Sequence, residues 1–280
     1  MLKKRLDIIL VERGYFTSRE KAKAAIMAGE ITVDGAVFDK PGMSVSEDVE
    51  IVHKGDKCPY VSRGGLKLEK ALISFNIELE GAICMDIGAS TGGFTDCMLK
   101  NGAEKVYAID VGYGQLDYSL RTDERVVNIE RCNFRLFEDN SENPIIKDKI
   151  DFASIDVSFI SLKHIFPKCA EFLKSGGKVC ALIKPQFEAG KEQVGKKGIV
   201  KDPKVHSSVI SNVLEYAKES GFGFENLDFS PIKGGKGNIE YLLLLNKDGD
   251  MRYNEMSDII EQTVSKAHEK LDLLQTMEVE

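Results

Sequence analysis

The stretch from Ala82 to Gln115 reads AICMDIGASTGGFTDCMLKNGAEKVYAIDVGYGQ and decides the fold. A short apolar run ends at Asp86, a loop of small residues follows, and a segment of helical length then ends at Gly102, a typical C-terminal cap. A second apolar run, residues 105–109, ends at Asp110. This order of strand, glycine loop, helix and strand predicts a parallel sheet that binds a ligand at the carboxyl ends of its strands.

The loop between the strand and the helix indicates what kind of ligand binds. Small residues let the backbone approach a ligand closely, and the N-terminus of the following helix favours a carboxylate or a phosphate. An acid at the end of the second strand, here Asp110, is positioned to accept hydrogen bonds from ribose hydroxyls. We therefore predict a cofactor that contains a nucleoside. The alternative is a glycine loop that binds no ligand.

The spacing of the loop favours S-adenosylmethionine over NAD. The dinucleotide fingerprint is G-x-G-x-x-G, whereas this loop reads D-x-G-x-x-x-G-G. Asp86 would repel a pyrophosphate but could hold an ammonium group. Asn133 follows a third predicted strand, residues 126–129. The residues predicted to bind the cofactor are Asp86, Gly88, Ala89, Ser90, Gly92, Gly93, Phe94, Asp110, Asn133 and Asp156.

The runs DIGASTGGFTD and AIDVGYGQL resemble the cofactor loop of the FtsJ-like ribose 2'-O-methyltransferases. Among these, they look most like the TlyA (haemolysin A) family of ribosomal RNA methyltransferases, and the resemblance extends over nearly the whole chain. It implies an α/β fold, with a Rossmann-like class I methyltransferase sheet and a small α+β N-terminal RNA-binding domain. It also implies an enzyme that methylates the 2'-hydroxyl of a cytidine in ribosomal RNA.

The rest of the methyltransferase region alternates predicted strands and helices. We expect further strands at residues 126–129, 150–155, 178–183 and 241–245, and helices near 68–75, 204–219 and 256–274. The segment from Glu188 to Asp202 is rich in glycine and lysine and lacks periodicity, so we expect a mobile loop over the substrate groove.

Four residues far apart in sequence are candidates for catalysis. A ribose hydroxyl is a poor nucleophile until its proton is removed or its oxyanion is stabilised, so a base must be tuned and the oxygen aligned. A lysine between two carboxylates is held in place by its salt bridges, and a second lysine nearby adds positive potential that stabilises the forming alkoxide. The FtsJ-like family uses a Lys–Asp–Lys–Glu tetrad. By motif it corresponds to Lys67 in SRGGLKL, Asp156 in DVSF, Lys184 in KPQF and Glu240 in NIEY.

Within this tetrad we assign Lys184 as the proton acceptor or alkoxide stabiliser, and we expect the other three residues to orient it. The alternative for each residue alone is an ordinary surface salt bridge. Lys70 lies near the start of the same predicted helix as Lys67, where a lysine is unfavourable for the helix dipole, so it either has a specific task or is solvated surface.

The N-terminal segment predicts a separate module of two helices and a hairpin, with its turn at Asp34-Gly35. Thr17 and Glu20 match a capping box at the start of the second helix. The pattern R-L-D-x-x-L-V-x-x-G…S-R-x-x-A…I-x-x-G resembles the alpha-L RNA-binding fold named after a ribosomal protein. We place this domain at residues 1–57, an interdomain linker at 58–62, and the methyltransferase domain at 63–280. Because the linker is short, we expect the domains to be coupled mechanically.

Basic residues near the helix starts predict where RNA binds, since they can contact phosphates. A solvated helix surface is the alternative. The predicted RNA-binding residues are Lys3, Lys4, Arg5, Arg19, Lys21, Lys23 and Arg63.

The charge distribution agrees with an RNA-binding protein although the net charge is −7. Residues 248–280 carry nine acids and three bases, whereas residues 3–23 carry seven bases and three acids. Six cysteines without C-x-x-C spacing indicate reduced core residues, with no metal site. No apolar run approaches membrane-spanning length. The basic start resembles that of a signal peptide, but Asp7, Glu12 and Arg13 interrupt what should be its apolar segment, so we expect a cytoplasmic protein. Ribosomal RNA or ribosomal subunits are the expected partners, and a monomer is slightly favoured.

Two other functions stay open at this stage. Asp156-Val-Ser-Phe159 loosely resembles the D-P-P-Y/F motif that stacks a flipped base, which would indicate base N-methylation, but the missing prolines and Lys184 argue against it. A non-catalytic RNA-binding or ribosome assembly factor that retains the methyltransferase scaffold belongs to a different class. A membrane-active haemolysin finds no support in the sequence.

Overall fold

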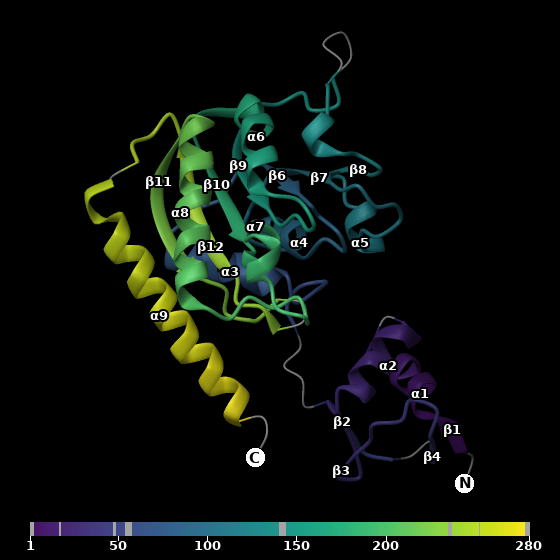
Figure 1. Cartoon of the computed structure of the whole chain (residues 1–280). Coiled ribbons are helices and arrows are strands. Elements are labelled where there is room, and N and C mark those ends of the chain that lie inside the picture. The colour runs from purple at the N-terminus through teal and green to yellow at the C-terminus, as the bar shows by residue number, and fades with distance from the viewer. Residues whose placement is uncertain are drawn as a thin grey trace. The chain divides into compact units, whose positions relative to one another are not determined.

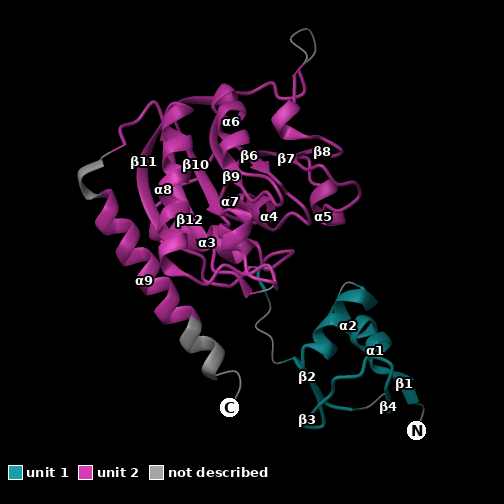
Figure 2. Cartoon of the chain, viewed as in Figure 1, with its two compact units in different colours: residues 1–59 teal, residues 60–280 magenta. Residues whose placement is uncertain are grey.

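The protein is described by a computed structural model that covers residues 3–16, 18–46, 49–53, 58–139, 144–234, 237–251 and 253–277. Within these ranges, the side chains of 253–255 and 272–277 are not described. The chain divides into two compact units, residues 1–59 and 60–280 (Figure 2). The division falls inside the segment that we expected to be a linker, between Pro59 and Tyr60.

The first unit has the predicted two helices and hairpin, with three further short strands. Asp34 and Gly35 both have positive φ, 49° and 79°, as a tight hairpin turn requires. Ser18 caps the second helix by accepting a hydrogen bond from the Lys21 amide, whereas Thr17, our predicted cap, lies outside the described residues. The elements are β1 (Lys3–Arg5), α1 (Leu6–Glu12), α2 (Arg19–Met27), β2 (Ile31–Val33), β3 (Ala36–Val37), β4 (Ser44–Ser46) and β5 (Ile51–His53).

The two helices of this unit pack on the hairpin because their apolar side chains share one face. Leu6, Ile9 and Leu10 of α1 are buried against Ala22 and Ile26 of α2. β2 pairs antiparallel with both β3 and β5, and β1 pairs with β4. The core of the unit is small, so each polar group buried in it needs a partner.

The second unit is built on a seven-stranded sheet in the order β11-β12-β10-β9-β6-β7-β8 (Figure 1). Its predicted strands are confirmed, although the strand expected at 178–183 begins earlier, at Leu173. The strands are β6 (Ile83–Ile87), β7 (Lys105–Ile109), β8 (Val126–Ile129), β9 (Ile150–Ile155), β10 (Leu173–Ile183), β11 (Phe222–Phe229) and β12 (Tyr241–Lys247).

Helices cover both faces of this sheet, because side chains alternate along each strand. Met85 and Ile87 point into one core, which α6, α8 and α9 close, whereas Cys84, the residue before Met85, points into the other, which α3, α4 and α5 close. The helices are α3 (Gly65–Ser74), α4 (Gly93–Lys100), α5 (Tyr118–Arg121), α6 (Phe166–Phe172), α7 (Pro185–Glu188), α8 (Pro203–Glu219) and α9 (Tyr253–Met277), with short 3₁₀ turns η1 (Phe134–Leu136), η2 (Leu162–His164) and η3 (Lys191–Gln193).

Three features differ from the sequence expectations. β12 runs antiparallel to both of its neighbours, so the sheet is not wholly parallel. β11 was not predicted, since Gly223 and three polar residues interrupt its apolar pattern. The segment 188–202 begins inside α7 and includes η3, so part of the expected irregular loop has local helical structure.

Candidate active site

Two ion pairs lie at the edge of the sheet where the parallel strands end. Lys184 Nζ is 2.5 Å from Asp156 Oδ1 and donates a 3.0 Å hydrogen bond to Ser158 Oγ. Lys67 Nζ is 2.6 Å from Glu240 Oε2, and both of these side chains are buried. We expected one lysine to lie between two carboxylates. Instead, each lysine has its own carboxylate.

The topology explains how these four residues meet. Asp156 follows β9 and Lys184 follows β10, and these parallel neighbours end at the same edge. Glu240 precedes β12, and because β12 is antiparallel to β10, its first residues lie at that edge too. Lys67 reaches the edge from the first turn of α3. The reversal of one strand therefore brings Glu240 to the site.

A cavity of about 430 Å³ opens between the two pairs. Lys67, Lys184 and Glu240 contribute to its wall together with amide and hydroxyl side chains, so it can hydrogen-bond a polar substrate. The remaining lining residues are Ser158, Phe159, Gln186, Phe187, Val194, Gly198 and Asn238.

An exposed aromatic residue stands at this cavity, which the sequence reasoning did not include among the site residues. Phe159 is 90% exposed, and its φ of 63° is unusual for a bulky residue. Its ring lies 4.8 Å from that of Phe187, centroid to centroid. An apolar ring held in water beside a polar cavity is suited to stack on a planar ligand. The DVSF motif was the available signal for it.

Asp86, the first acid of the glycine loop, is fully enclosed. Its carboxylate accepts hydrogen bonds from Thr95 Oγ1 at 2.6 Å and from Ser154 Oγ at 3.0 Å. Burial raises the pKa of Asp86 to about 6, while the two hydroxyls favour the charged form. Both of its oxygens therefore already bind the protein, and its evident task in this geometry is to tie the helix after the loop to β9.

Asp110, the second acid, organises the loop from the neighbouring strand. Its Oδ2 accepts a 2.8 Å hydrogen bond from the Ser90 amide, and its Oδ1 accepts one of 2.6 Å from the Gly112 amide. The carboxylate is only partly buried, and each oxygen has a second lone pair. Asp110 can therefore hold the loop and still accept hydrogen bonds from a ligand's hydroxyls.

The loop itself needs glycine at Gly88 and Gly92, which have φ of 89° and 94°. At Gly88 a Cβ would lie 2.7 Å from the carbonyl oxygen of Asp156, so any side chain there would push the two strand ends apart. Ser90 is exposed, Ala89, Gly93 and Phe94 are buried, and Asn133 is exposed beyond β8. Phe94 packs in the core, so its ring does not face a ligand.

In the first unit, two of the predicted RNA-binding residues share one buried acid. Arg5 donates to Asp7 from Nε and Nη2 at 2.9 and 3.1 Å, and Arg19 donates from the same two nitrogens at 3.3 and 2.9 Å. The Asp7 side chain has no exposed surface, and hydrogen bonds from Arg5 lower its pKa to about 2 despite burial. Asp7 thus fixes two half-exposed guanidinium groups side by side.

The remaining predicted RNA-binding residues have varied surroundings. Lys4 pairs with Glu12 at 2.6 Å. Lys3 and Lys21 are exposed and Lys23 is partly buried, all within the first unit. Arg63 is exposed and belongs to the second unit.

Comparison with known proteins identifies the family. Residues 60–247 match the FtsJ-like methyltransferase model, which covers well over half of the chain, and residues 4–51 match the S4 domain. The chain belongs to the FtsJ-like methyltransferase family. This confirms the family that we inferred from the glycine loop, and the S4 match confirms the RNA-binding fold inferred for the N-terminus.

Relatives of this FtsJ-like protein match nearly end to end. The chain is 39% identical to the 16S/23S rRNA (cytidine-2'-O)-methyltransferase TlyA of Mycobacterium tuberculosis, over 94% of this chain and 97% of that protein. It is 45% identical to hemolysin A of Brachyspira hyodysenteriae, over 85% of this chain and 98% of that protein. A solved structure from Streptococcus thermophilus is 47% identical and covers 99% of both chains, with a TM-score of 0.77.

Lys70 has a structural task in this FtsJ-like fold. It pairs with Asp228 at 3.0 Å, donates to the carbonyl of Phe229 and lies 3.7 Å from the centroid of the Phe229 ring. Burial lowers the pKa of Lys70, and Asp228 opposes that shift. Lys70 therefore ties α3 to the end of β11, which accounts for a lysine at this helix position.

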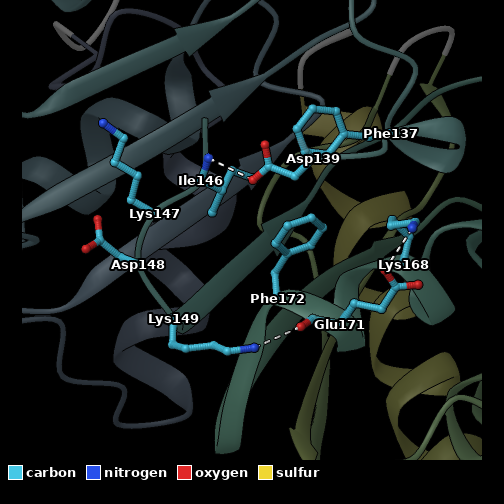
Figure 3. A pocket seen from close by; sticks show the side chains of 9 residues that line it. All are labelled: Phe137, Asp139, Ile146, Lys147, Asp148, Lys149, Lys168, Glu171 and Phe172. Carbon is cyan, nitrogen blue, oxygen red and sulfur yellow. Dashed lines mark hydrogen bonds and ion pairs between the residues drawn. The ribbon is translucent and has the colours of Figure 1, made fainter. Parts of the chain in front are cut away.

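A second cavity, of about 300 Å³, lies near the start of β9 (Figure 3). Several of its charged groups already have partners: Lys168 pairs with Glu171 at 2.8 Å, and Asp139 accepts from the Ile145 and Ile146 amides. It lies away from the carboxyl ends of the strands, where such sheets bind ligands. The cavity between the two ion pairs is therefore the candidate active site.

Among the helices in the described part of the chain, none is both long and apolar enough to cross a membrane.

Proposed function

We propose that this FtsJ-like protein transfers a methyl group from S-adenosylmethionine to the ribose 2'-hydroxyl of a cytidine in ribosomal RNA. The observation that carries the proposal is the pair of lysine–carboxylate contacts, Lys67–Glu240 and Lys184–Asp156, around one polar cavity. The choice of base and of RNA rests on similarity to the relative from Mycobacterium tuberculosis named as an rRNA (cytidine-2'-O)-methyltransferase.

In this proposal the lysines act on the hydroxyl that attacks. Asp156 and Ser158 hold the amine of Lys184, which then accepts the hydroxyl proton if it is neutral or stabilises the forming alkoxide if it is charged. Lys67, held by buried Glu240, also lines the cavity and adds positive potential there. The oxygen becomes more nucleophilic by either route.

The glycine loop fits the cofactor. S-adenosylmethionine would supply a methyl group that is already activated by its positively charged sulfur. Gly88 and Gly92 allow the positive φ angles that shape the loop, Asp110 has acceptor capacity for the ribose hydroxyls, and exposed Asn133 offers an amide beyond β8. Asp86 would act mainly by shaping the loop through Thr95 and Ser154.

Two features favour RNA as the substrate. Arg5 and Arg19 present paired guanidinium groups in a domain that matches the S4 model, and Arg groups suit phosphate contacts. Phe159 and Phe187 form an exposed aromatic step beside Lys184, on which a splayed-out base can stack. A base on Phe159 would bring its own ribose toward the cavity.

Mass analysis of nucleosides, after the protein is incubated with ribosomal subunits and isotope-labelled S-adenosylmethionine, tests the proposal. We expect label in 2'-O-methylcytidine, and far less of it with Lys184→Ala. Label on a base would support the N-methylation alternative instead. Binding of RNA without any transfer, at saturating cofactor, would support the non-catalytic assembly factor and overturn the proposed reaction.

A further inference from the structure

Two loops carry most of the proposed active site, and they touch at three places. The loop after β9 holds Asp156, Ser158 and Phe159, and the segment after β10 holds Lys184 and Phe187. The lysine reaches across to the first two side chains, and the two aromatic rings meet. The third contact lies at the far end of both loops and involves a residue outside the proposed chemistry.

Glu188, the last residue of α7, makes this third contact. Its Oε2 accepts a 2.7 Å hydrogen bond from Ser161 Oγ, and its Oε1 accepts one of 2.8 Å from the Leu162 amide. Ser161 Oγ in turn accepts from the Lys163 amide at 3.2 Å, which orients the hydroxyl. Both carboxylate oxygens are thus engaged at the start of η2. Burial raises the pKa of Glu188, and these hydrogen bonds oppose that rise.

The loop after β9 needs such an anchor because of Phe159. A phenylalanine with a φ of 63° is in a sparsely populated backbone region, and such a residue persists only where its surroundings fix it. The Asp156 amide binds the Ile87 carbonyl at 2.9 Å, which anchors the start of the loop to the sheet. The Glu188 hydrogen bonds anchor its end. Between these points Phe159 is 90% exposed, so packing alone does not hold it.

We propose that Glu188 is a positioning residue that fixes the loop carrying Phe159 against the segment carrying Lys184, so that a nucleoside stacked on Phe159 has its 2'-hydroxyl at Lys184. The proposal rests on the proposed function, because it assumes a nucleoside substrate in this cavity. It assigns Glu188 no contact with substrate or cofactor. Without the Glu188 carboxylate, the loop that carries Phe159 would relax, and the 2'-hydroxyl of the substrate would be misplaced relative to Lys184.

Single-turnover methyl transfer by the full chain tests this, with ribosomal subunits varied and S-adenosylmethionine saturating. We expect Glu188→Ala to slow transfer by about tenfold to a hundredfold, since a misplacement of 1 Å costs about that much. Its affinity for S-adenosylmethionine should stay within about twofold of the wild type. Glu188→Gln should recover most of the rate, because its amide oxygen can accept from the Leu162 amide and its amide nitrogen can donate to Ser161.

Ser161→Ala and Glu171→Ala complete the design. Ser161→Ala removes one of the two hydrogen bonds with little change in volume, so it should show a smaller loss and guards against a Glu188→Ala protein that does not fold. Glu171→Ala removes a carboxylate that pairs with Lys168 on α6 and should transfer at the wild-type rate. Wild-type transfer by Glu188→Ala would overturn the proposal. So would loss of cofactor affinity in parallel with transfer, since that indicates general destabilisation.

The product separates this inference from the proposed function. A wild-type product methylated on a base would overturn ribose methylation, while the ratio of the Glu188→Ala and wild-type rates would still report on the anchor. If both proteins made a 2'-O-methylated product equally fast, the positioning role of Glu188 would be overturned, while ribose methylation would stand.

Discussion

Lys67 Nζ lies 2.6 Å from Glu240 Oε2, although 173 residues separate the two in the chain. Only 11% of the lysine side chain and 2% of the glutamate side chain are exposed. Gln186 Nε2 also lies 3.4 Å from the other oxygen of Glu240, at the outer limit of a hydrogen bond. Burying two charges is costly, and such a pair is weak evidence for stability. Its position in the wall of the cavity therefore points to function.

The first prediction separates the stability of this pair from its function. Lys67→Met should destabilise the second unit by about 3–5 kcal/mol, because it leaves Glu240 buried and uncompensated. The double variant Lys67→Met with Glu240→Gln should recover most of that stability and still fail to transfer methyl groups. Thermal unfolding and single-turnover transfer measure the two effects. Full activity in the double variant would show that the pair is only structural.

The second prediction concerns Lys184. Lys184→Ala should reduce transfer by about a hundredfold to ten-thousandfold, the usual contribution of a general base, with nearly unchanged cofactor affinity. Lys184→Arg should not restore transfer, because a guanidinium does not release its proton at neutral pH and its planar fork differs in reach from the lysine amine. Transfer is measured at saturating cofactor and affinity by calorimetry. Transfer at the wild-type rate by Lys184→Ala would remove the central residue from the proposed mechanism.

The third prediction concerns the cofactor loop. Asp110→Ala should weaken S-adenosylmethionine binding by about 1–3 kcal/mol, through lost hydrogen bonds to ribose and a loosened Ser90 amide. Asp123→Ala is the matched control, since Asp123 pairs with Arg125 and lies outside the loop. Calorimetry with S-adenosylmethionine and with NAD measures both effects. Tighter binding of NAD than of S-adenosylmethionine by the wild type would contradict the assignment of the loop.

The positions of the catalytic candidates could be predicted from sequence, but their pairing could not. Asp156 and Lys184 end apolar runs, and residues at the ends of parallel strands meet. Glu240 precedes its strand, so its place in the site depends on the reversal of β12, and no local pattern encodes that reversal. Local sequence patterns therefore could not identify Glu240 as the ion-pair partner of Lys67. Phe159 was missed as a site residue because exposure and a positive φ are properties of the folded loop.

Asp86 and Lys70 show a second limit of sequence patterns. An acid before a glycine loop has the same letters whether it faces a ligand or binds hydroxyls inside the fold. Thr95 and Ser154 bind Asp86, and only the packing of α4 and β9 against β6 brings them there. Likewise, the partners of Lys70 come from β11, a strand that its own sequence did not reveal.

The fourth prediction is a pH dependence in the first unit. Because Arg5 and Arg19 lower the pKa of Asp7 from 3.8 to about 2, the folded state favours the ionised form. The resulting stabilisation, about 2 kcal/mol, should be present above pH 4 and lost as the pH falls from about 4 to about 2. Hydrogen exchange of α1 amides in the full chain, corrected for intrinsic rates, measures it. Asp7→Asn should not show this loss of stability at low pH. If its pH profile were identical to that of the wild type, the assignment of the loss to Asp7 would be refuted.

The last prediction asks whether Arg5 and Arg19, the two arginines that donate hydrogen bonds to Asp7, contact RNA. Asp7 binds two of the five N–H donors on each guanidinium, and the side chains of Arg5 and Arg19 remain 45% and 46% exposed, so both can also meet phosphates. Arg5→Ala should weaken binding to ribosomal RNA and lower the slope of log K against log salt by about one, the amount for one lost phosphate contact.

Arg125→Ala, which removes an arginine paired with Asp123 in the second unit, is the control and should leave the slope unchanged. Arg19→Ala should match Arg5→Ala if the two act as a fixed pair. An unchanged slope in both Asp7-linked variants would mean that RNA follows a path away from Asp7, and the paired arginines would then serve only to neutralise a buried acid.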